Sequence, residues 1–190
     1  MIMRELSLNI LDIAQNSVSA KASLIKIIID ENTALHTMSI IIDDDGCGMD
    51  AEQLERVKDP FFTTRTTRKV GMGVPLFKMA AEMTGGSFEI KSTPGEGTAV
   101  KAVFKTDSID FTPLGDIAST VVTLVTMNTN IDFLYRYICD GREFELSTVQ
   151  MKELLGGVSL AEPEVAAWMR DYLKEQTQII HGGVVYNENT

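Results

Sequence analysis

The stretch from Phe61 to Leu76 constrains the fold of this chain more than any other part of the sequence. Two aromatic residues are followed by threonines and cations, and then by Gly71 and Gly73, which are one residue apart. The glycines tolerate positive φ and allow another group to approach the backbone closely. Pro75 suits the first turn of a helix, because a backbone N–H would have no partner there. The pattern therefore predicts a lid that leads into the N-terminus of a helix.

A helix that begins in this way can bind an anion. Its free N–H groups favour negative charge, and Arg65, Arg68 and Lys69 lie just upstream with the complementary charge. We therefore interpret the stretch as a lid that closes over phosphates. The alternative is a glycine turn without a ligand, and the stretch taken alone leaves both interpretations open.

Composition and charge exclude several classes of protein. The 190 residues suggest one domain, or one domain with an appendage. The net charge of −10 without a basic stripe disfavours a nucleic-acid partner. Cys47 and Cys139 have no metal-site spacing and fit a reducing compartment. Polar residues among the first twelve lead us to expect no signal peptide there, and no apolar run approaches the ~20 residues of a membrane span. The expectation is a cytoplasmic protein that binds neither nucleic acid nor membrane.

Hydrophobic periodicity predicts a chain of alternating helices and strands. Residues 117–127 are assigned to a helix, although their threonines and valines would also suit a strand, and Asp140-Gly141 indicates a hairpin. The expected helices are 3–20, 51–58, 74–83, 117–127, 148–155 and 162–180, and the expected strands are 23–30, 37–43, 87–92, 98–105, 131–139 and 142–146.

The first predicted helix carries a narrow polar stripe opposite its apolar face. The stripe consists of Glu5, Asn9, Asp12 and Asn16, and it holds no cation, although solvated helix faces normally mix both signs of charge. Asp12 and Asn16 lie one turn apart and offer the oxygen ligands that Mg²⁺ takes. On these residues alone, a ligand-binding stripe and a solvated face remain equally open.

The second predicted strand runs into three acidic residues and a glycine pair. Gly46 and Gly48 allow a sharp reversal and leave room for a flat ligand beside the backbone. A buried carboxylate at this strand end would accept a hydrogen bond from an exocyclic amine such as that of adenine. The alternative is a solubilising turn. Cys47, between the glycines, is interpreted as a small filler, because no histidine is near it in the sequence.

In this order, the motifs resemble the superfamily of gyrase, heat-shock chaperone, histidine-kinase and MutL ATPases (GHKL). Residues 12–17 (DIAQNS) are similar to the helix that supplies the catalytic base and the magnesium-binding asparagine, and residues 44–49 (DDGCGM) to the DxGxG box whose aspartate reads adenine. Residues 60–64 resemble the phenylalanine box before the ATP lid, 71–76 the second glycine box, and 94–98 the last box, whose threonine lies near the adenine. The resemblance covers residues 5 to about 105.

The resemblance implies an α+β fold of the Bergerat type. It would be a two-layer α/β sandwich, with helices on one face of a mixed, mainly antiparallel sheet. An ATPase domain would span residues 1–105. Residues 106–190 lie outside the resemblance, and we expect them to form a small α/β accessory region. The implied ligands are ATP and Mg²⁺, with Asp12 as the catalytic residue and Asn16 as the metal ligand. The residues expected to contact the nucleotide are Asn16, Asp44, Gly46, Gly48, Met49, Thr63, Thr64, Arg68, Lys69, Gly71, Met72, Gly73, Val74, Leu76 and Thr98.

Two classes of function remain open at this stage. The first is a Mg-ATP-dependent kinase or ATPase that transfers the γ-phosphoryl group to a partner protein or to water. The second is a nucleotide-gated binding module with negligible turnover. The lid is short, as in histidine kinases. Asp12 stands where many members have glutamate, and Pro75 stands where a small polar residue or glycine is common. His36 and His181 lie in no helical hairpin ahead of the ATPase domain, so we do not expect a complete sensor kinase. A protein acceptor or regulator is the expected partner, and a homodimer is allowed.

Overall fold

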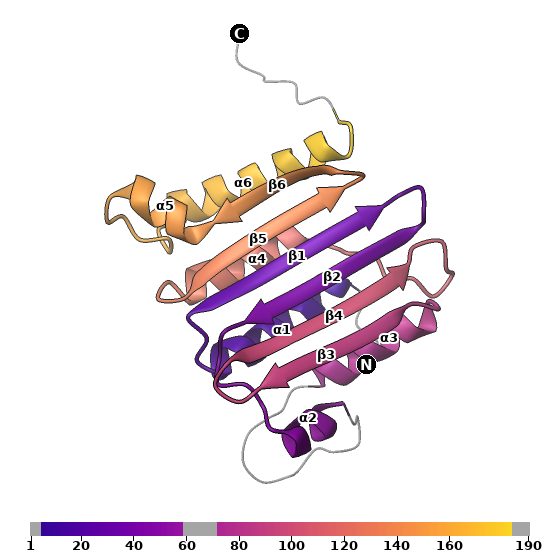
Figure 1. The fold of residues 1–190 in the computed structure, drawn as a ribbon. Helices are drawn as coiled ribbons and strands as arrows, with labels where there is room; N and C mark the ends of the chain where they lie inside the picture. Colours follow the sequence, from indigo (N-terminus) through magenta and orange to yellow (C-terminus); the bar gives the residue numbers. More distant parts are fainter. Residues whose placement is uncertain (1–4, 59–71, 184–190) are drawn as a thin grey trace.

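The computed structural model describes residues 5–58 and 72–183 (Figure 1). Within them, six strands form one sheet in the order β3-β4-β2-β1-β5-β6. The β1–β5 pair is parallel and every other neighbouring pair is antiparallel. The strands are β1 (Leu24–Asn32), β2 (Thr37–Asp44), β3 (Ser87–Thr93), β4 (Gly97–Lys105), β5 (Asp132–Cys139) and β6 (Arg142–Ser147). The helices are α1 (Leu6–Ser19), α2 (Ala51–Val57), α3 (Gly73–Met83), α4 (Ile117–Met127), α5 (Thr148–Leu155) and α6 (Pro163–Ile180).

The molecule has two layers, and helices α1, α3, α4 and α6 lie on the same side of the sheet (Figure 1). The central strands β1, β2 and β5 alternate buried and partly exposed residues, as expected when only one face of a sheet is covered. The buried isoleucines of β1 and β2 pack under α1, which buries Leu6, Ile10 and Ile13. The predicted two-layer fold with a mixed, mainly antiparallel sheet is confirmed.

Residues 117–127 form helix α4, so the helical assignment for this ambiguous segment is confirmed. The Asp116 side chain accepts a hydrogen bond from the backbone N–H of Ser119 at 3.0 Å and caps the helix. Val121, Leu124 and Val125 are buried at helical spacing. The cap and this packing outweigh the modest preference of threonine and valine for strands.

The C-terminal half of the chain continues the sheet of the N-terminal half. Strand β5 pairs with β1 from Leu24↔Asp132 to Glu31↔Cys139. The segment before α4 also caps the start of α1, because the N–H of Leu6 donates to the carbonyl of Pro113 at 2.9 Å. The division into two domains at residue 105 stays a prediction, with one sheet running across it. None of the helices in the described residues is long and apolar enough to cross a membrane.

Candidate functional site

Predicted site residues from four parts of the chain lie on neighbouring elements near the end of β2. Asp44 is the last residue of β2, and it lies opposite Thr98 of β4 in the antiparallel register. Helix α1 packs against this end of the sheet and bears Asp12 and Asn16. Gly73 begins α3, which packs beside α1. The fold therefore brings together motifs that are far apart in the sequence.

The Asp44 carboxylate is buried and held on both oxygens. Its Oδ2 accepts a hydrogen bond of 2.5 Å from the hydroxyl of Ser17, and its Oδ1 accepts one of 2.9 Å from the backbone N–H of Gly46. A carboxylate oxygen can accept more than one hydrogen bond. Asp44 is therefore fixed in place and can still accept a further hydrogen bond from a ligand. Sequence reasoning missed Ser17, and its only signal was its place beside Asn16.

The acidic neighbours of Asp44 have structural roles. Asp45 accepts hydrogen bonds from the backbone N–H groups of Ser23 at 2.7 Å and Leu24 at 2.9 Å, and also from the Ser23 hydroxyl. Burial works to raise the pKa of Asp45, but these hydrogen bonds outweigh it and hold the pKa below its ordinary value. Asp43 forms an ion pair of 3.2 Å with Lys26. Of the three acidic residues, only Asp44 is buried.

The glycines after β2 are required by close backbone contacts. A Cβ on Gly46 would lie 2.9 Å from the Cβ of Ala20 at the end of α1. Gly48 has φ +65°, and a Cβ there would come within 1.9 Å of the Thr93 carbonyl oxygen. A side chain at either position would push the loop away from its neighbours. The loop that carries Met49 is therefore fixed between α1 and the β3–β4 turn.

Ser92 connects this loop to Thr98. The backbone N–H of Met49 donates to the Ser92 hydroxyl oxygen at 2.8 Å, and that hydroxyl donates to the Gly97 carbonyl at 2.9 Å. The hydroxyls of Ser92 and Thr98 are 2.8 Å apart. Sequence reasoning did not select Ser92, since a serine on an edge strand has no distinctive pattern. The network ties the predicted residues Met49 and Thr98 into one arrangement.

The four members of the α1 polar stripe lie in different environments. Glu5 accepts a hydrogen bond from the backbone N–H of Asp116 at 3.2 Å, so it faces the connection to α4. Asn9 is only 2% exposed. Asp12 and Asn16 are both partly exposed. A uniformly solvated face is therefore excluded for this helix, and the two residues with the predicted roles remain accessible.

Asp12 lies against the start of α3. A Cβ on Gly73 would come within 2.8 Å of the Asp12 Cβ, so a glycine is needed for this approach. Burial raises the pKa of the Asp12 carboxyl, because a low-dielectric setting disfavours the charged form. No hydrogen bond from residues 5–58 or 72–183 reaches the Asp12 side chain. The structure thus holds a carboxyl with a raised pKa at the junction of the two helices.

Helix α3 begins at this junction, and none of the described residues accepts a hydrogen bond from the backbone N–H groups of Gly73 or Val74. Met72 stands at its N-cap with an exposed side chain and makes no side-chain cap hydrogen bond, while Val74 is buried and Leu76 is partly buried. The predicted lid residues Thr63, Thr64, Arg68, Lys69 and Gly71, together with Phe61 and Phe62, lie outside the described residues. Their roles stay predictions.

The residues of this site fit a nucleotide with a hard cation. Asn16 supplies an amide oxygen, one of the oxygen ligands that Mg²⁺ takes, and Asp12 supplies a carboxylate one helical turn away. Asp44 supplies a fixed hydrogen-bond acceptor. Gly46 and Gly48 carry no side chains, so a ligand can approach the backbone of this loop closely. The start of α3 supplies N–H groups suited to an anion.

Comparison with known proteins also relates this chain to ATP-binding proteins. The sequence model of a family described as "Histidine kinase-, DNA gyrase B-, and HSP90-like ATPase" matches residues 1–108. A protein of Shewanella frigidimarina named as a sensor protein is 32% identical over 103 residues, which are 54% of this chain and 15% of that protein. The signal transduction histidine-protein kinase AtoS of Escherichia coli is 32% identical over 97 residues, which are 50% of this chain and 15% of the kinase.

These matches are local. A probable C4-dicarboxylate sensor kinase of Bacillus subtilis is 34% identical over 67 residues, 35% of this chain and 12% of that kinase. The chain thus matches well under a fifth of the length of these relatives. Among solved structures, the N-terminal domain of a DNA repair protein superposes with a TM-score of 0.58 at 17% identity, covering 77% of this chain and 53% of that domain. This last likeness concerns the fold alone.

Proposed function

Because the chain belongs to the family of histidine kinase-, DNA gyrase B- and HSP90-like ATPases, we propose that it binds Mg-ATP and transfers the γ-phosphoryl group to a partner protein or to water. The observation that carries this proposal is the position of Asp44. Its carboxylate is buried and fixed by hydrogen bonds from Ser17 and Gly46, at the start of the loop that contains Gly46 and Gly48. A fixed carboxylate can accept a hydrogen bond from the exocyclic amine of adenine, and a backbone without side chains at the glycines leaves room for the flat ring.

The adenine would lie over the loop that follows β2. Asp44 would accept a hydrogen bond from the exocyclic amine, and Gly46 and Gly48 would leave room for the ring. Thr98 is the register partner of Asp44, and its hydroxyl is held beside Ser92. We propose Thr98 and Met49 as the neighbours of the base on the sheet side.

The phosphates would lie toward the start of α3. Asn16 would hold Mg²⁺, which supplies charge neutralisation of the phosphates in reactions of this type. The N–H groups at Gly73 and Val74 would face the phosphate oxygens. Asp12 would accept or orient the proton of the attacking hydroxyl, imidazole or water, and its raised pKa brings it closer to working pH.

The phosphoryl acceptor is proposed to lie outside this chain. The chain has two histidines. His36 is in the turn between β1 and β2, and His181 follows the last turn of α6. Neither is in a helical hairpin, so the described fold offers no histidine of the kind that sensor kinases phosphorylate. The same observation is consistent with the second function, a nucleotide-gated regulatory module with negligible turnover.

The experiment that tests the proposal compares two neighbouring carboxylates. Asp44→Ala should lose Mg-ATP binding measured by calorimetry, while Asp43→Ala, whose parent residue pairs with Lys26, should keep it. Circular dichroism would establish that both variants are folded. Unchanged ATP affinity in folded Asp44→Ala would refute the adenine assignment. Release of labelled phosphate, with and without cell extract, then distinguishes the enzyme from the nucleotide-gated module.

A further inference from the structure

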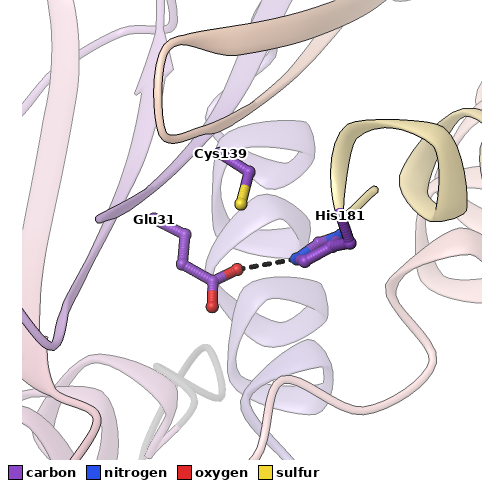
Figure 2. Close-up of side chains that lie close together, drawn as sticks. All are labelled: Glu31, Cys139 and His181. Atoms are coloured by element: carbon purple, nitrogen blue, oxygen red, sulfur yellow. Dashed lines mark hydrogen bonds and ion pairs between the residues drawn. The ribbon is translucent and has the colours of Figure 1, made fainter. Parts of the chain in front are cut away.

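Three side chains from distant parts of the sequence gather at the opposite end of the sheet. Glu31 lies near the end of β1, Cys139 ends β5, and His181 follows α6. Figure 2 shows them turned toward one another, and their potential ligand atoms all lie within 4.8 Å of one another. Glu31 is paired with Met38 near the start of β2, whereas Asp44 ends that strand. The cluster is therefore separate from the proposed nucleotide site.

The imidazole of His181 is held so that one nitrogen faces the cluster. Its Nδ1 is 2.7 Å from the Thr177 carbonyl oxygen, which can only accept, so Nδ1 carries a hydrogen. Its Nε2 is 2.9 Å from Oε2 of Glu31 (Figure 2). A neutral ring would then direct a lone pair at a carboxylate oxygen. A positive charge at Nε2, from a proton or from a metal ion, is needed to make this contact favourable.

The other two members of the cluster also fit a metal site. The hydroxyl of Tyr137 donates to Glu31 Oε2 at 2.9 Å, as outer partners of metal-bound carboxylates do. The Cys139 side chain is only 1% exposed. A thiolate at this buried position would be stabilised by a cation beside it.

We propose that Glu31, Cys139 and His181 bind Zn²⁺ through a carboxylate oxygen, the thiolate sulfur and imidazole Nε2. These three ligand types are the ones zinc takes, and a water would fill the fourth tetrahedral position. Binding replaces the proton of the Cys139 thiol and the proton of His181 Nε2, and both are released to solvent. The ion would join β1, β5 and the end of α6.

Two charged neighbours influence this site. Arg142 follows the β5–β6 turn, and a Cβ on Gly182 would lie 3.7 Å from one of its guanidinium nitrogens. The positive charge of Arg142 disfavours binding of Zn²⁺ nearby. Asp140 contributes negative charge from the same turn and is held by Thr33. The net field therefore depends on both side chains, and Arg142→Ala should strengthen metal binding.

The test uses the full chain without an affinity tag, reduced and stripped of metal. Zinc is titrated against a chromophoric chelator, and Co²⁺ serves as the spectroscopic probe. We expect one equivalent of Zn²⁺ and a cobalt spectrum with a thiolate charge-transfer band. Cys139→Ser and His181→Ala should abolish both signals, whereas Cys47→Ser, which removes the exposed cysteine, should change neither. Tyr137→Phe should weaken zinc binding about 10- to 100-fold.

The result can also overturn the proposal. His181 is exposed, so His181→Ala should leave the sheet intact. This variant therefore tests the proposal even if Cys139→Ser does not fold. Zinc binding by the parent no tighter than by His181→Ala, or a cobalt spectrum without the thiolate band, would show that the contact is only an ion pair between Glu31 and a protonated His181.

Discussion

The hydroxyl of Ser17 donates a 2.5 Å hydrogen bond to the Asp44 carboxylate, joining α1 to the end of β2. This contact connects two motifs that lie 27 residues apart in the sequence. Helix α1 bears the proposed metal and proton-transfer residues, and the end of β2 bears the proposed adenine acceptor. The distance between the two ends of the site is therefore set in part by one buried side-chain contact.

Replacing Ser17 should lower both stability and nucleotide affinity. Ser17→Ala removes one of the two hydrogen bonds that fix Asp44 and leaves a buried carboxylate less well satisfied, at a cost of about 1–3 kcal/mol in the free energy of unfolding. Urea denaturation measures this loss, and calorimetry measures Mg-ATP binding. Ser19→Ala is the matched control, because the exposed Ser19 hydroxyl donates to the Gln15 carbonyl within the same helix. Equal stability of the two variants would contradict the role of Ser17.

The closeness of Gly73 and Asp12 predicts a coupled pair of substitutions. In Gly73→Ala the new Cβ would meet the Asp12 Cβ at 2.8 Å, and relieving that contact should cost about 1–3 kcal/mol of stability. Adding Asp12→Gly removes the opposing Cβ. The double variant should then lose less stability than the two single changes added together, by at least about 0.5 kcal/mol. Urea denaturation of the parent, the two single variants and the double variant measures this coupling. Strictly additive changes in the free energy of unfolding would contradict the close contact between the start of α3 and α1.

Asp116 should make α4 sensitive to acid. Hydrogen bonds from the backbone and the side chain of Ser119 hold the pKa of Asp116 below its ordinary value of 3.8. Because the folded-state pKa is the lower one, this contribution is present above pH 3.8 and disappears as the pH falls through the folded value. Asp116→Ala should cost about 0.5–2 kcal/mol at neutral pH, and the difference from the parent should shrink in acid. Asp107→Ala, at an exposed position outside α4, is the control for removing a carboxylate that caps no helix.

The elements of this fold were predictable because their signals are local. Periodicity and turn residues located every strand and helix that the structure describes to within a few residues, and Asp140-Gly141 formed the expected hairpin turn. The pairing of β5 with β1 was not predictable, since the parallel register depends on how α4 returns the chain across the sheet. Sequence patterns establish what an element is more readily than which element lies beside it.

The same distinction applies to the sites. Asp12, Asn16 and Asp44 belong to short motifs, so their residue types and spacing were visible in the sequence. Ser92 acts only through contacts that the folded sheet creates. The cluster of Glu31, Cys139 and His181 has no spacing typical of a metal site, because its members come from two strands and a helix end. Such a cluster appears only once the chain is folded.

Asn16 should determine the metal dependence of nucleotide binding. Asn16→Ala removes an amide oxygen from α1 and should abolish the stimulation of ATP binding by Mg²⁺, measured by calorimetry with and without the metal. Alanine is the better helix former, so stability should stay the same or rise by up to about 0.7 kcal/mol. Gln15→Ala, one position away, should retain the metal effect. A magnesium dependence that survives Asn16→Ala would assign the ion to another ligand.

Asp12 separates catalysis from nucleotide binding. A carboxylate one turn from the proposed metal ligand adds no attraction for an anionic phosphate group, and its charge should weaken ground-state binding if it has any effect. Its use would be proton transfer, which is worth ~10²–10⁴-fold in rate, and its raised pKa suits that task. Asp12→Ala should therefore keep or improve ATP affinity while phosphate release or transfer falls by that factor. Asp12→Glu, with one more methylene, should retain part of the activity. If Asp12→Ala turned over ATP at the parental rate, the base would have to be another group. If the parent showed no turnover with any extract fraction, nucleotide-gated binding would be its function.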